Sequence, residues 1–264
     1  KTLRGTTDEG IGLKALHILN AWSVENGICI GQLKVEDKSN EITAVPQLIE
    51  LLDLKGCIVT TDALNTQKEI AAKIKEAKAD YVLPVKDNHK DLKEDIELMF
   101  KDAVEKEFKG VDADHYETIE KGHGRIERRV YYVIDAEELP DRKKWEGLQS
   151  LGMVIRERTI KEKTTTEVVY YLMSTEIDAK LMDRCVRGHW GVESSLHWRL
   201  DVILREDYSR YRERIGAQNL AVLRKITLGV LSKSPWKKKC GIASKRLAAA
   251  ADERDREELI KNFL

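Results

Sequence analysis

Residues 56–85 read GCIVTTDALNTQKEIAAKIKEAKADYVLPV, and this stretch decides the fold class. The run 56–61 is short, continuous and apolar, as is typical of a buried strand. Residues 66–78 read as a helix with Thr66 as its N-cap, and 80–85 read as a second strand. Strands that alternate with helices predict a mixed α/β sheet with helices on its faces.

The residues before this stretch predict a hairpin and a helix. Residues 14–35 contain two partly alternating apolar runs on either side of Asn26-Gly27, and Asn-Gly is a strong signal for a β-hairpin. Residues 40–53 change to a three- and four-residue apolar period, which predicts a helix capped by Ser39 or Asn40.

The residues after it continue the alternation and then change character. A long amphipathic helix is predicted over 89–108, and further helices are predicted over 178–203, over 212–232 and at the end of the chain. Residues 115–134 and 151–173 are rich in β-branched and aromatic side chains, which predicts strands. The second half therefore begins with a β-rich part and ends with helices.

The bulk composition narrows the class of protein. Hydrophobic residues make up 42% and charged residues 35%, which predicts a folded chain with a core. The formal net charge is zero, so only local basic patches can point to a nucleic acid. No apolar run reaches the ~20 residues of a membrane span, and no signal peptide is recognisable. Four cysteines without a CxxC pair predict free thiols in a reducing cytosol: Cys29, Cys57, Cys185 and Cys240.

Asp62 directly follows the strand 56–61, and chemistry in open α/β sheets recurs at the carboxyl ends of strands. The competing interpretation is that Asp62 caps the turn into the next helix. Position alone ranks Asp53, Asp80 and Asp87 similarly, so another signal must choose among these acids.

The segment 187–207, RGHWGVESSLHWRLDVILRED, is the densest group of unusual residues. Four polar side chains recur at every fourth position, each about 40° from the last on a helix, and so predict one polar stripe: His189, Glu193, His197 and Asp201. The alternative is a buried helix with satisfied histidines and core tryptophans. Zinc is a further alternative, but the segment has no HExxH and no nearby thiolate, and its carboxylate equally suits hard cations.

This segment, through HWGVE at 189–193, LHWRLDV at 196–202 and Glu206-Asp207, closely resembles the last catalytic block of bacterial insertion-sequence DDE transposases of the H-repeat-associated type. Six other blocks resemble the family in the same order: KTLRG at 1–5, NAW at 20–22, GQLKVEDKSNEI at 31–42, IVTTDA at 58–63, DYVLPVKDN at 80–88 and KGHGRIER at 121–128. The resemblance covers nearly the whole chain to about residue 231.

The resemblance implies an RNase H-like mixed sheet with flanking helices and a β-rich insertion before the last catalytic helix. The expected parts are 1–110 as the first half of the core without its first strand, 111–175 as the insertion, 176–232 as the helical completion of the core, and 233–264 as a basic tail with a helix.

The resemblance also implies the site. Asp62 matches the second family Asp and Glu193 the final Glu, as catalytic and metal-binding residues. Two Mg²⁺ (or Mn²⁺) ions ~3.5–4 Å apart are expected in a complete site, for phosphodiester cleavage at the element end and strand transfer into target DNA. His189 and His197 are candidate accessory residues that orient a water or contact phosphate, with simple packing as the competing interpretation.

The chain departs from the family at two points. The first family Asp precedes the Lys-Thr-Leu-Arg block that opens here at Lys1, so this Asp and its strand are expected to be absent, leaving a sheet edge exposed. Asp8 does not replace it, and Ser194 stands where the family usually has Asn. The alternative functions are a catalytically dead remnant that at most binds DNA and a nuclease without strand transfer.

Double-stranded DNA, as element ends and target, is the expected partner, bound by a homodimer at the nucleoid in the bacterial cytoplasm. Basic side chains supply the sequence-independent part of such binding. The candidate contacts are Arg125, Arg128, Arg205, Arg210, Arg212, Arg214, Lys237, Lys238 and Lys239, and a solvated surface is the competing interpretation. Arg224, Lys225, Lys233, Lys245 and Arg246 belong to the same basic stretches.

Overall fold

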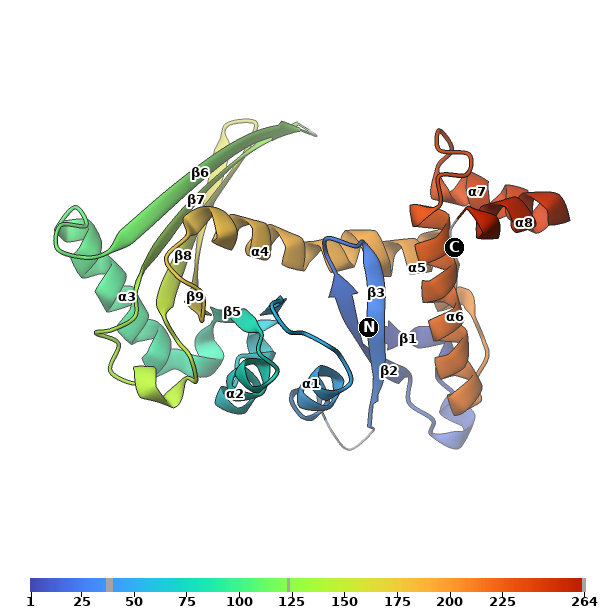
Figure 1. Ribbon diagram of the computed structural model, residues 1–264, viewed down its shortest axis with the longest axis horizontal. Helices are drawn as coiled ribbons and strands as arrows, with labels where there is room; N and C mark the ends of the chain where they lie inside the picture. Colours follow the sequence, from blue (N-terminus) through green and yellow to red (C-terminus); the bar gives the residue numbers. More distant parts are fainter. Residues whose placement is uncertain (37–39, 123, 263–264) are drawn as a thin grey trace. The chain divides into compact units, whose positions relative to one another are not determined.

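The computed structural model describes residues 1–36, 40–122 and 124–262. The chain forms two compact units, a central unit of Asp53–His189 and a terminal unit made of Lys1–Leu52 and Trp190–Leu264. Figure 1 shows the helices and strands of both units. Within the described ranges, every helix is too short or too polar to cross a membrane.

The central unit is built on a six-stranded mixed sheet with the order β4-β5-β9-β8-β7-β6. β4 and β5 pair in parallel, and the other neighbouring strands pair antiparallel. The strands are β4 Ile58–Thr60, β5 Asp80–Val85, β6 Ala113–Gly122, β7 Arg125–Asp135, β8 Ser150–Ile160 and β9 Lys163–Met173.

The parallel pair follows the predicted strand–helix–strand order. β4 is followed by a 3-10 turn, Ala63–Asn65, and by α2, Lys68–Glu76, which leads into β5. The predicted cap is wrong, because Gln67 occupies the N-cap position of α2. Thr66 is buried and its hydroxyl donates to the Pro84 carbonyl at 2.7 Å. Thr66 therefore links the loop before α2 to β5 through the hydrogen bond of its hydroxyl to the Pro84 carbonyl.

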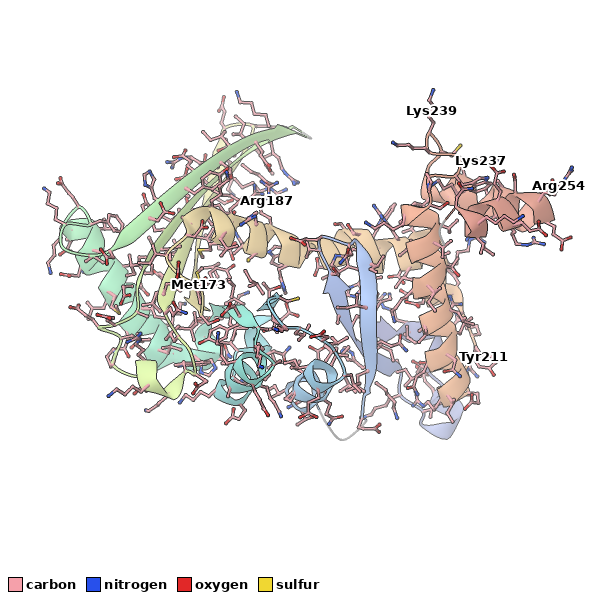
Figure 2. All side chains as sticks on the ribbon, in the orientation of Figure 1. Met173, Arg187, Tyr211, Lys237, Lys239 and Arg254 are labelled. Carbon is pink, nitrogen blue, oxygen red and sulfur yellow. The ribbon has the colours of Figure 1, made fainter. Side chains whose placement is uncertain are left out.

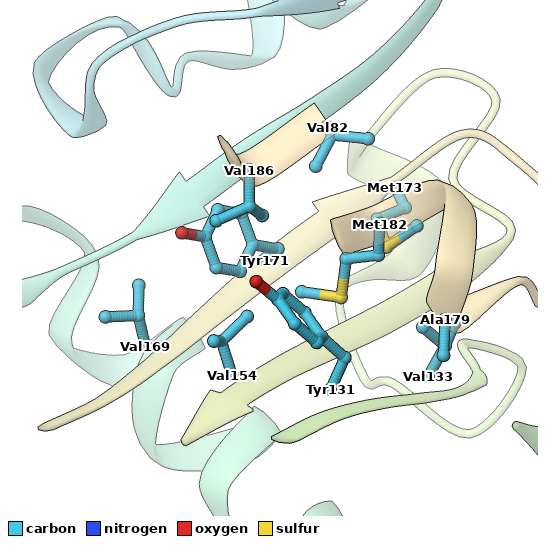
Figure 3. Packing of buried hydrophobic residues seen from close by; sticks show 10 residues of the cluster. All are labelled: Val82, Tyr131, Val133, Val154, Val169, Tyr171, Met173, Ala179, Met182 and Val186. Atoms are coloured by element: carbon cyan, nitrogen blue, oxygen red, sulfur yellow. The ribbon is translucent and has the colours of Figure 1, made fainter. Parts of the chain in front are cut away.

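Helices cover both faces of the central sheet. Neighbouring residues of a strand point to opposite faces. On one face, the ring of Tyr170 in β9 stacks on Phe100 of α3, Lys90–Glu105, with 5.8 Å between centroids. On the other face, Tyr171 packs in a buried cluster with residues of α4, Ala179–Val192 (Figure 3).

The β-rich part consists of two long hairpins, because each of the two alternating stretches folds back on itself. β6 pairs with β7 from Ala113↔Ile134 to Gly122↔Arg125, and β8 pairs with β9 from Ser150↔Met173 to Ile160↔Lys163. β9 also pairs with β5, which makes the hairpins a continuation of the central sheet. The predicted fold class is thereby confirmed: a mixed sheet with flanking helices and a β-rich insertion before α4.

The terminal unit contains a three-stranded antiparallel sheet of β1 Thr2–Leu3, β2 Leu16–Ser23 and β3 Ile28–Val35. The predicted Asn-Gly hairpin is confirmed, with Gly27 at a φ of 58° in the turn between β2 and β3. This is the left-handed region, which glycine occupies without the strain that a Cβ would bring.

Helices complete the terminal unit: α1 Glu41–Glu50, α5 Trp198–Val202, α6 Arg214–Lys233, α7 Ile242–Ala251 and α8 Glu253–Lys261. α6 buries Ala217 and Ala221 against Leu16 and Ile18 of β2. Asn40 stands at the predicted cap position of α1, whereas Ser39 lies outside the described residues. Short 3-10 turns occupy Arg4–Thr6, Glu9–Ile11, Asp87–His89, Arg142–Lys144 and Glu206–Tyr208.

The helix predicted over 178–203 is not one regular helix. α4 ends at Val192, the five residues Glu193–His197 form a π-helical turn, and α5 follows directly. A π turn contains one residue more than an α turn and often marks a functional site.

Candidate active site

Asp62 stands two residues beyond the end of β4, where it begins the 3-10 turn. Its backbone carbonyl accepts the Asn65 amide at 2.9 Å, but its carboxylate makes no capping hydrogen bond. The side chain is 73% exposed. The turn therefore uses the backbone of Asp62 and leaves the carboxylate available for another role.

His189 on α4 forms a hydrogen bond with that carboxylate. Its Nε2 lies 3.2 Å from Asp62 Oδ1, and its Nδ1 lies 3.2 Å from the Thr60 hydroxyl oxygen. With the proton on Nε2, the ring donates to Asp62 and the Thr60 hydroxyl donates to Nδ1. The imidazole thus links the end of β4 to the acid that follows it.

The charge state of Asp62 follows from these neighbours. The hydrogen bond from His189 lowers the pKa of the Asp62 carboxyl below its ordinary value, and the nearby Lys86 charge acts in the same direction. Partial burial opposes both effects without cancelling them. Asp62 is therefore an ionised, accessible carboxylate at neutral pH.

The three acids that position ranked beside Asp62 serve other contacts. Asp80 pairs with Lys75 at 2.6 Å, Asp87 pairs with Lys93 at 2.8 Å, and Asp53 accepts the backbone amide of the residue two positions on. Asp80 also accepts the Ser174 hydroxyl at 2.8 Å, so it is held by two side chains. Asp62 differs from these three acids in that its partner is a histidine, 127 residues away on α4.

Three residues near Asp62 were missed by the sequence reasoning. Thr60 contacts His189, Lys86 contributes its charge, and Asn88 donates its side-chain amide to the Ala63 carbonyl at 3.0 Å. Lys86 and Asn88 belong to the block DYVLPVKDN, whose resemblance to the family was the signal that could have found them.

Glu193 opens the π turn on the terminal unit. Its side chain is exposed, and its backbone carbonyl accepts the amide of Trp198, five residues on. Leu196 and Leu200 are buried and pack with Leu228 of α6. These leucines anchor one side of the helix and leave Glu193 on its exposed side.

The predicted stripe of four polar residues does not form as a regular series, because the π turn interrupts the fourfold spacing. His189 contacts Asp62, Glu193 faces solvent, and His197 is half-buried. Asp201 accepts a hydrogen bond from the side-chain Nζ of Lys1 at 2.6 Å. The four residues of the predicted stripe therefore have different surroundings and different contacts.

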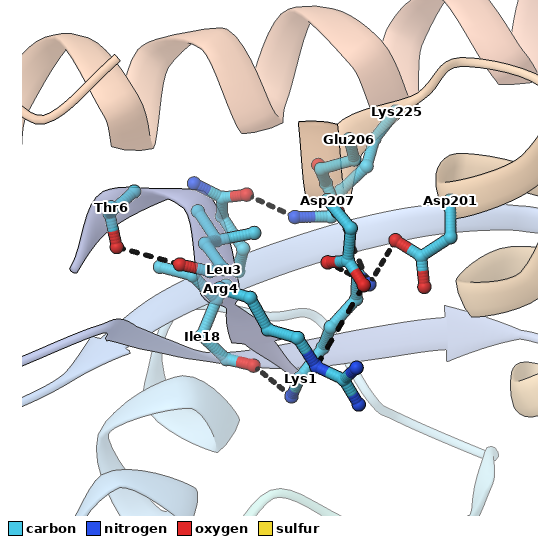
Figure 4. A network of polar contacts seen from close by, with 10 residues as sticks. Lys1, Leu3, Arg4, Thr6, Ile18, Asp201, Glu206, Asp207 and Lys225 are labelled. Carbon is cyan, nitrogen blue, oxygen red and sulfur yellow. Dashed lines mark hydrogen bonds and ion pairs between the residues drawn. The ribbon is translucent and has the colours of Figure 1, made fainter. Parts of the chain in front are cut away.

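Figure 4 shows the polar network that holds the segment after Glu193 within the terminal unit. The side-chain Nζ of Lys1 lies 2.6 Å from a carboxylate oxygen of Asp201, 3.6 Å from one of Glu206 and 3.8 Å from one of Asp207. Glu206 is 3% exposed, and its burial raises the pKa of its carboxyl. Lys225, also buried, donates to the Gln32 side chain at 2.5 Å.

The candidate DNA-binding cations divide into two groups. Five of them already have partners: Arg125 pairs with Glu127, Arg128 with Glu117 and Glu157, Arg212 with Asp8, and Lys237 with Asp255, while Arg214 donates to the Lys14 carbonyl. Four are exposed and form no ion pair within the described residues: Arg205, Arg210, Lys238 and Lys239. Figure 2 shows Lys237 and Lys239 on the loop between α6 and α7.

Two cations of the basic stretches are internal rather than superficial. Lys225 and Lys245 are 8% and 5% exposed, and Lys245 donates to the Leu231 and Ser234 carbonyls at the end of α6. These two lysines stabilise the fold and do not offer their charge to a ligand.

The donor atoms of the described residues decide which metal ion the protein can bind. The described part of the chain contains no cluster of three or more His, Cys, Asp or Glu side chains able to hold a metal ion. The accessible carboxylates of Asp62 and Glu193 are the oxygen ligands that Mg²⁺ prefers. Each of the two acids fits a hard cation in chemical type; Asp62 belongs to the central unit and Glu193 to the terminal unit.

Comparison with known proteins shows which protein family this sequence resembles. The sequence pattern of the family described as "Transposase DDE domain" matches residues 3–229. The putative transposase YncI of Escherichia coli O157:H7 is 42% identical over 236 residues, which cover 88% of this chain and 60% of that protein. The H repeat-associated putative transposase YhhI of Escherichia coli strain K12 is 38% identical over 258 residues, which cover 96% of this chain and 67% of that protein.

The chain thus spans between 60% and 67% of the length of these relatives. No solved structure matches it significantly.

Proposed function

The chain belongs to the transposase DDE-domain family, and on that basis we propose that it cuts and joins DNA strands with Asp62 and Glu193 as metal-binding carboxylates. Family membership supports DNA transposition and dependence on a divalent metal in general terms. The observation that carries the assignment of Asp62 is its exposed, ionised carboxylate, which is oriented by His189 instead of capping its own turn.

The proposed reaction has two steps. In the first, a water oxygen attacks a phosphorus at the element end, and the bond to the 3′-oxygen breaks to leave a 3′-hydroxyl. In the second, that hydroxyl attacks a phosphodiester of the target DNA and displaces another 3′-oxygen. Bound Mg²⁺ or Mn²⁺ supplies activation of the attacking oxygen and stabilisation of the leaving oxygen.

The residues of this chain would hold and orient the reacting groups. Asp62 and Glu193 would bind the metal through their carboxylate oxygens. His189 would keep Asp62 in one orientation, as partners of metal-binding carboxylates commonly do. Since His189 is engaged with Asp62, it is better suited to positioning this acid than to contacting phosphate, and His197 stays a candidate accessory residue.

The exposed cations that lack ion pairs are the proposed contacts to the DNA backbone: Arg205, Arg210, Lys238 and Lys239. Phosphate contacts of this type give affinity without sequence preference. Action as a homodimer on double-stranded DNA, at the nucleoid in the bacterial cytoplasm, completes the proposal, and sedimentation of the protein with and without element-end DNA tests the dimer. The division into parts at residues 110, 175 and 232 is likewise a proposal.

A cleavage and strand-transfer assay tests the function, using the complete protein that contains these residues. Element-end duplex DNA and a supercoiled target plasmid are incubated with Mg²⁺, with Mn²⁺, or with a chelator. We expect metal-dependent products that Asp62→Asn and Glu193→Gln each abolish. Asp91→Asn on α3 and Glu257→Gln on α8 are matched controls, because both acids are exposed, and should leave the products unchanged. Cleavage that survives either site substitution would overturn the assignment of that residue.

A further inference from the structure

Strand β6 forms one edge of the central sheet. Among the described residues it pairs with β7 on one side and with no strand on the other (Figure 1). β6 contains ten residues, whereas β4 at the opposite edge contains three. An edge strand presents a row of backbone N–H and C=O groups with which a strand of another chain can pair. The long edge at β6 is therefore the better place for pairing between chains.

Three side chains of β6 lie on the face of the sheet that is turned away from α4. Ile119 is 60% exposed, and Glu117 and Lys121 stand two positions before and after it on the same face. Tyr116, on the opposite face, packs against the buried cluster that contains residues of α4. Lys121 is exposed and forms no ion pair within the described ranges.

Acidic and basic side chains alternate across the strands that lead to this edge. Arg128 of β7 pairs with Glu157 of β8 at 3.1 Å and with Glu117 of β6 at 2.7 Å. Opposite charges on neighbouring strands stabilise their pairing, and like charges placed opposite each other weaken it. The row ends at the edge with an acid, so a basic side chain on an added strand would continue the alternation.

A second copy of β6 supplies this base when the two strands pair antiparallel about Ile119. In that register Ile119 lies opposite its own copy, and Glu117 of each strand lies opposite Lys121 of the other. Moving the centre by one residue would set a charged side chain opposite Ile119. Moving it to Glu117 would set two carboxylates opposite each other. The sequence of β6 thus favours one register over its neighbours.

Apolar surface at the edge favours the same register. Ile126 of β7 is 41% exposed and lies opposite Lys121, which makes it a diagonal neighbour of Ile119. Pairing about Ile119 would bring both copies of the two isoleucines together and remove their surface from water. A lysine on an edge strand normally keeps other strands away, but here it would face Glu117 of the second copy.

The other face of β6 tolerates this pairing as well. Glu120 already pairs with Arg129 at 3.0 Å and with Arg187 at 2.6 Å, so its charge is compensated within the chain. In the register centred on Ile119, Thr118 of the second copy would lie opposite Glu120. The pairing therefore sets no two like charges directly opposite each other.

We propose that two copies of the chain form a dimer by antiparallel pairing of their β6 strands about Ile119. A twofold contact of this kind uses the same edge of both copies and closes, so it gives a dimer and not an open chain of copies. This inference identifies the contact surface of the homodimer that the proposed function includes, and it requires neither metal nor DNA.

Cysteine cross-linking in the absence of DNA and metal tests the contact. The complete protein carries Cys57→Ser and Cys240→Ser, which remove the exposed native thiols. We expect Ile119→Cys to give a disulfide-linked dimer under mild oxidation, because residues directly opposite each other have Cα atoms ~4.5–5.5 Å apart, within the range of a disulfide. Ile160→Cys in β8 is the matched control, since Ile160 is also exposed (44%), and should give no linked dimer.

A mixture of two variants tests the register. Glu117→Cys and Lys121→Cys proteins that carry tags of different size should cross-link to each other. Each variant alone should cross-link little, because two identical positions then lie about 13 Å apart along the strands.

Sedimentation at a series of protein concentrations gives a measurement that needs no cysteine. Ile119→Glu places two carboxylates opposite each other at the centre, so it should raise the dissociation constant of the dimer by about 5-fold or more. Ile119→Val should keep the dimer, because valine retains an apolar side chain suited to a strand. Ile160→Glu is the matched control and should leave the dissociation constant unchanged.

Three outcomes would overturn the inference: a monomer at every concentration, no linked dimer in Ile119→Cys, or a dimer that Ile119→Glu leaves intact. Failure of the proposed function looks different, because it appears as cleavage that persists in Asp62→Asn or Glu193→Gln. The cross-link between the β6 strands does not depend on that cleavage.

Discussion

The Nε2 atom of His189 lies 3.2 Å from the Asp62 carboxylate, although 127 residues separate the two in sequence. The contact joins a helix to the residue that follows an edge strand of the central sheet. It orients the carboxylate without covering it, since 73% of the Asp62 side chain stays exposed.

Replacing His189 should weaken the activation of DNA cleavage by Mg²⁺ while lowering the stability of the fold only slightly. Loss of a partner that orients a metal-binding residue typically costs 10–100-fold in metal affinity, so His189→Ala should raise the Mg²⁺ concentration for half-maximal cleavage by about that factor. The unfolding free energy should change by only roughly 0.5–1.5 kcal/mol, the typical net value of one hydrogen bond. Thr60→Val, which leaves the contact between His189 and Asp62 in place, should have a smaller effect. Equal metal activation in His189→Ala and the unchanged protein would contradict the positioning role.

The buried carboxyl of Glu206 should make the stability of the protein depend on pH. Burial raises the pKa of Glu206 in the folded chain above its ordinary value of about 4.3. The folded state therefore binds this proton more tightly, and the stability that Glu206 contributes is complete below about pH 4.3 and lost as the pH rises through the raised pKa. Lys1 and Lys225 oppose the shift without abolishing it.

Glu206→Gln removes this titration, so the unfolding free energy of the variant should increase relative to the unchanged protein between pH 4 and pH 7. Urea denaturation at a series of pH values measures it. The exposed Glu257→Gln should give a curve parallel to that of the unchanged protein. A parallel curve for Glu206→Gln as well would show that Glu206 does not titrate as a buried acid.

Gly5→Ala should destabilise the terminal unit. A Cβ on Gly5 would overlap the carbonyl oxygen of Ser209, and a backbone atom cannot move aside as the end of a flexible side chain can. Overpacking of this kind typically costs 1–3 kcal/mol, so thermal denaturation should show a lower midpoint. Gly191→Ala is the contrasting substitution, since its Cβ meets open space inside a helix and should stabilise by roughly 0.5–1 kcal/mol. An unchanged midpoint in Gly5→Ala would contradict the close approach of the two backbones.

Lys239 and Lys237 should differ in their contribution to DNA binding, although both lie on one loop (Figure 2). The Lys237 ammonium group pairs with Asp255 at 2.7 Å, whereas Lys239 forms no ion pair within the described ranges. Lys239→Gln should reduce the slope of log affinity against log salt by about 0.9, the value for one released counterion. Lys237→Gln should leave the slope nearly unchanged. Equal slopes in both variants would show that Lys239 contributes no more to DNA binding than the ion-paired Lys237 does.

Local patterns were sufficient to predict many elements of the fold, although not the interruption of the helix predicted over 178–203. The Asn-Gly turn, the apolar run before Asp62 and the helical period after it are properties of short segments, so their outcome depends little on the rest of the chain. The family resemblance rests on ordered sequence blocks and selected Asp62 and Glu193 from many acids. The sequence by itself thus determined the fold class, the family and the two candidate carboxylates.

Tertiary structure alone decided what each of these residues contacts. The Thr66 hydroxyl donates to the Pro84 carbonyl instead of capping the helix as predicted. Lys225 and Lys245 are buried instead of contributing to the predicted basic surface. The π turn Glu193–His197 interrupts the helix that the fourfold spacing of polar residues predicts. The physical reason is that burial, hydrogen-bond partners and helix registry depend on atoms distant in sequence, and the spacing of residues along one segment does not record them.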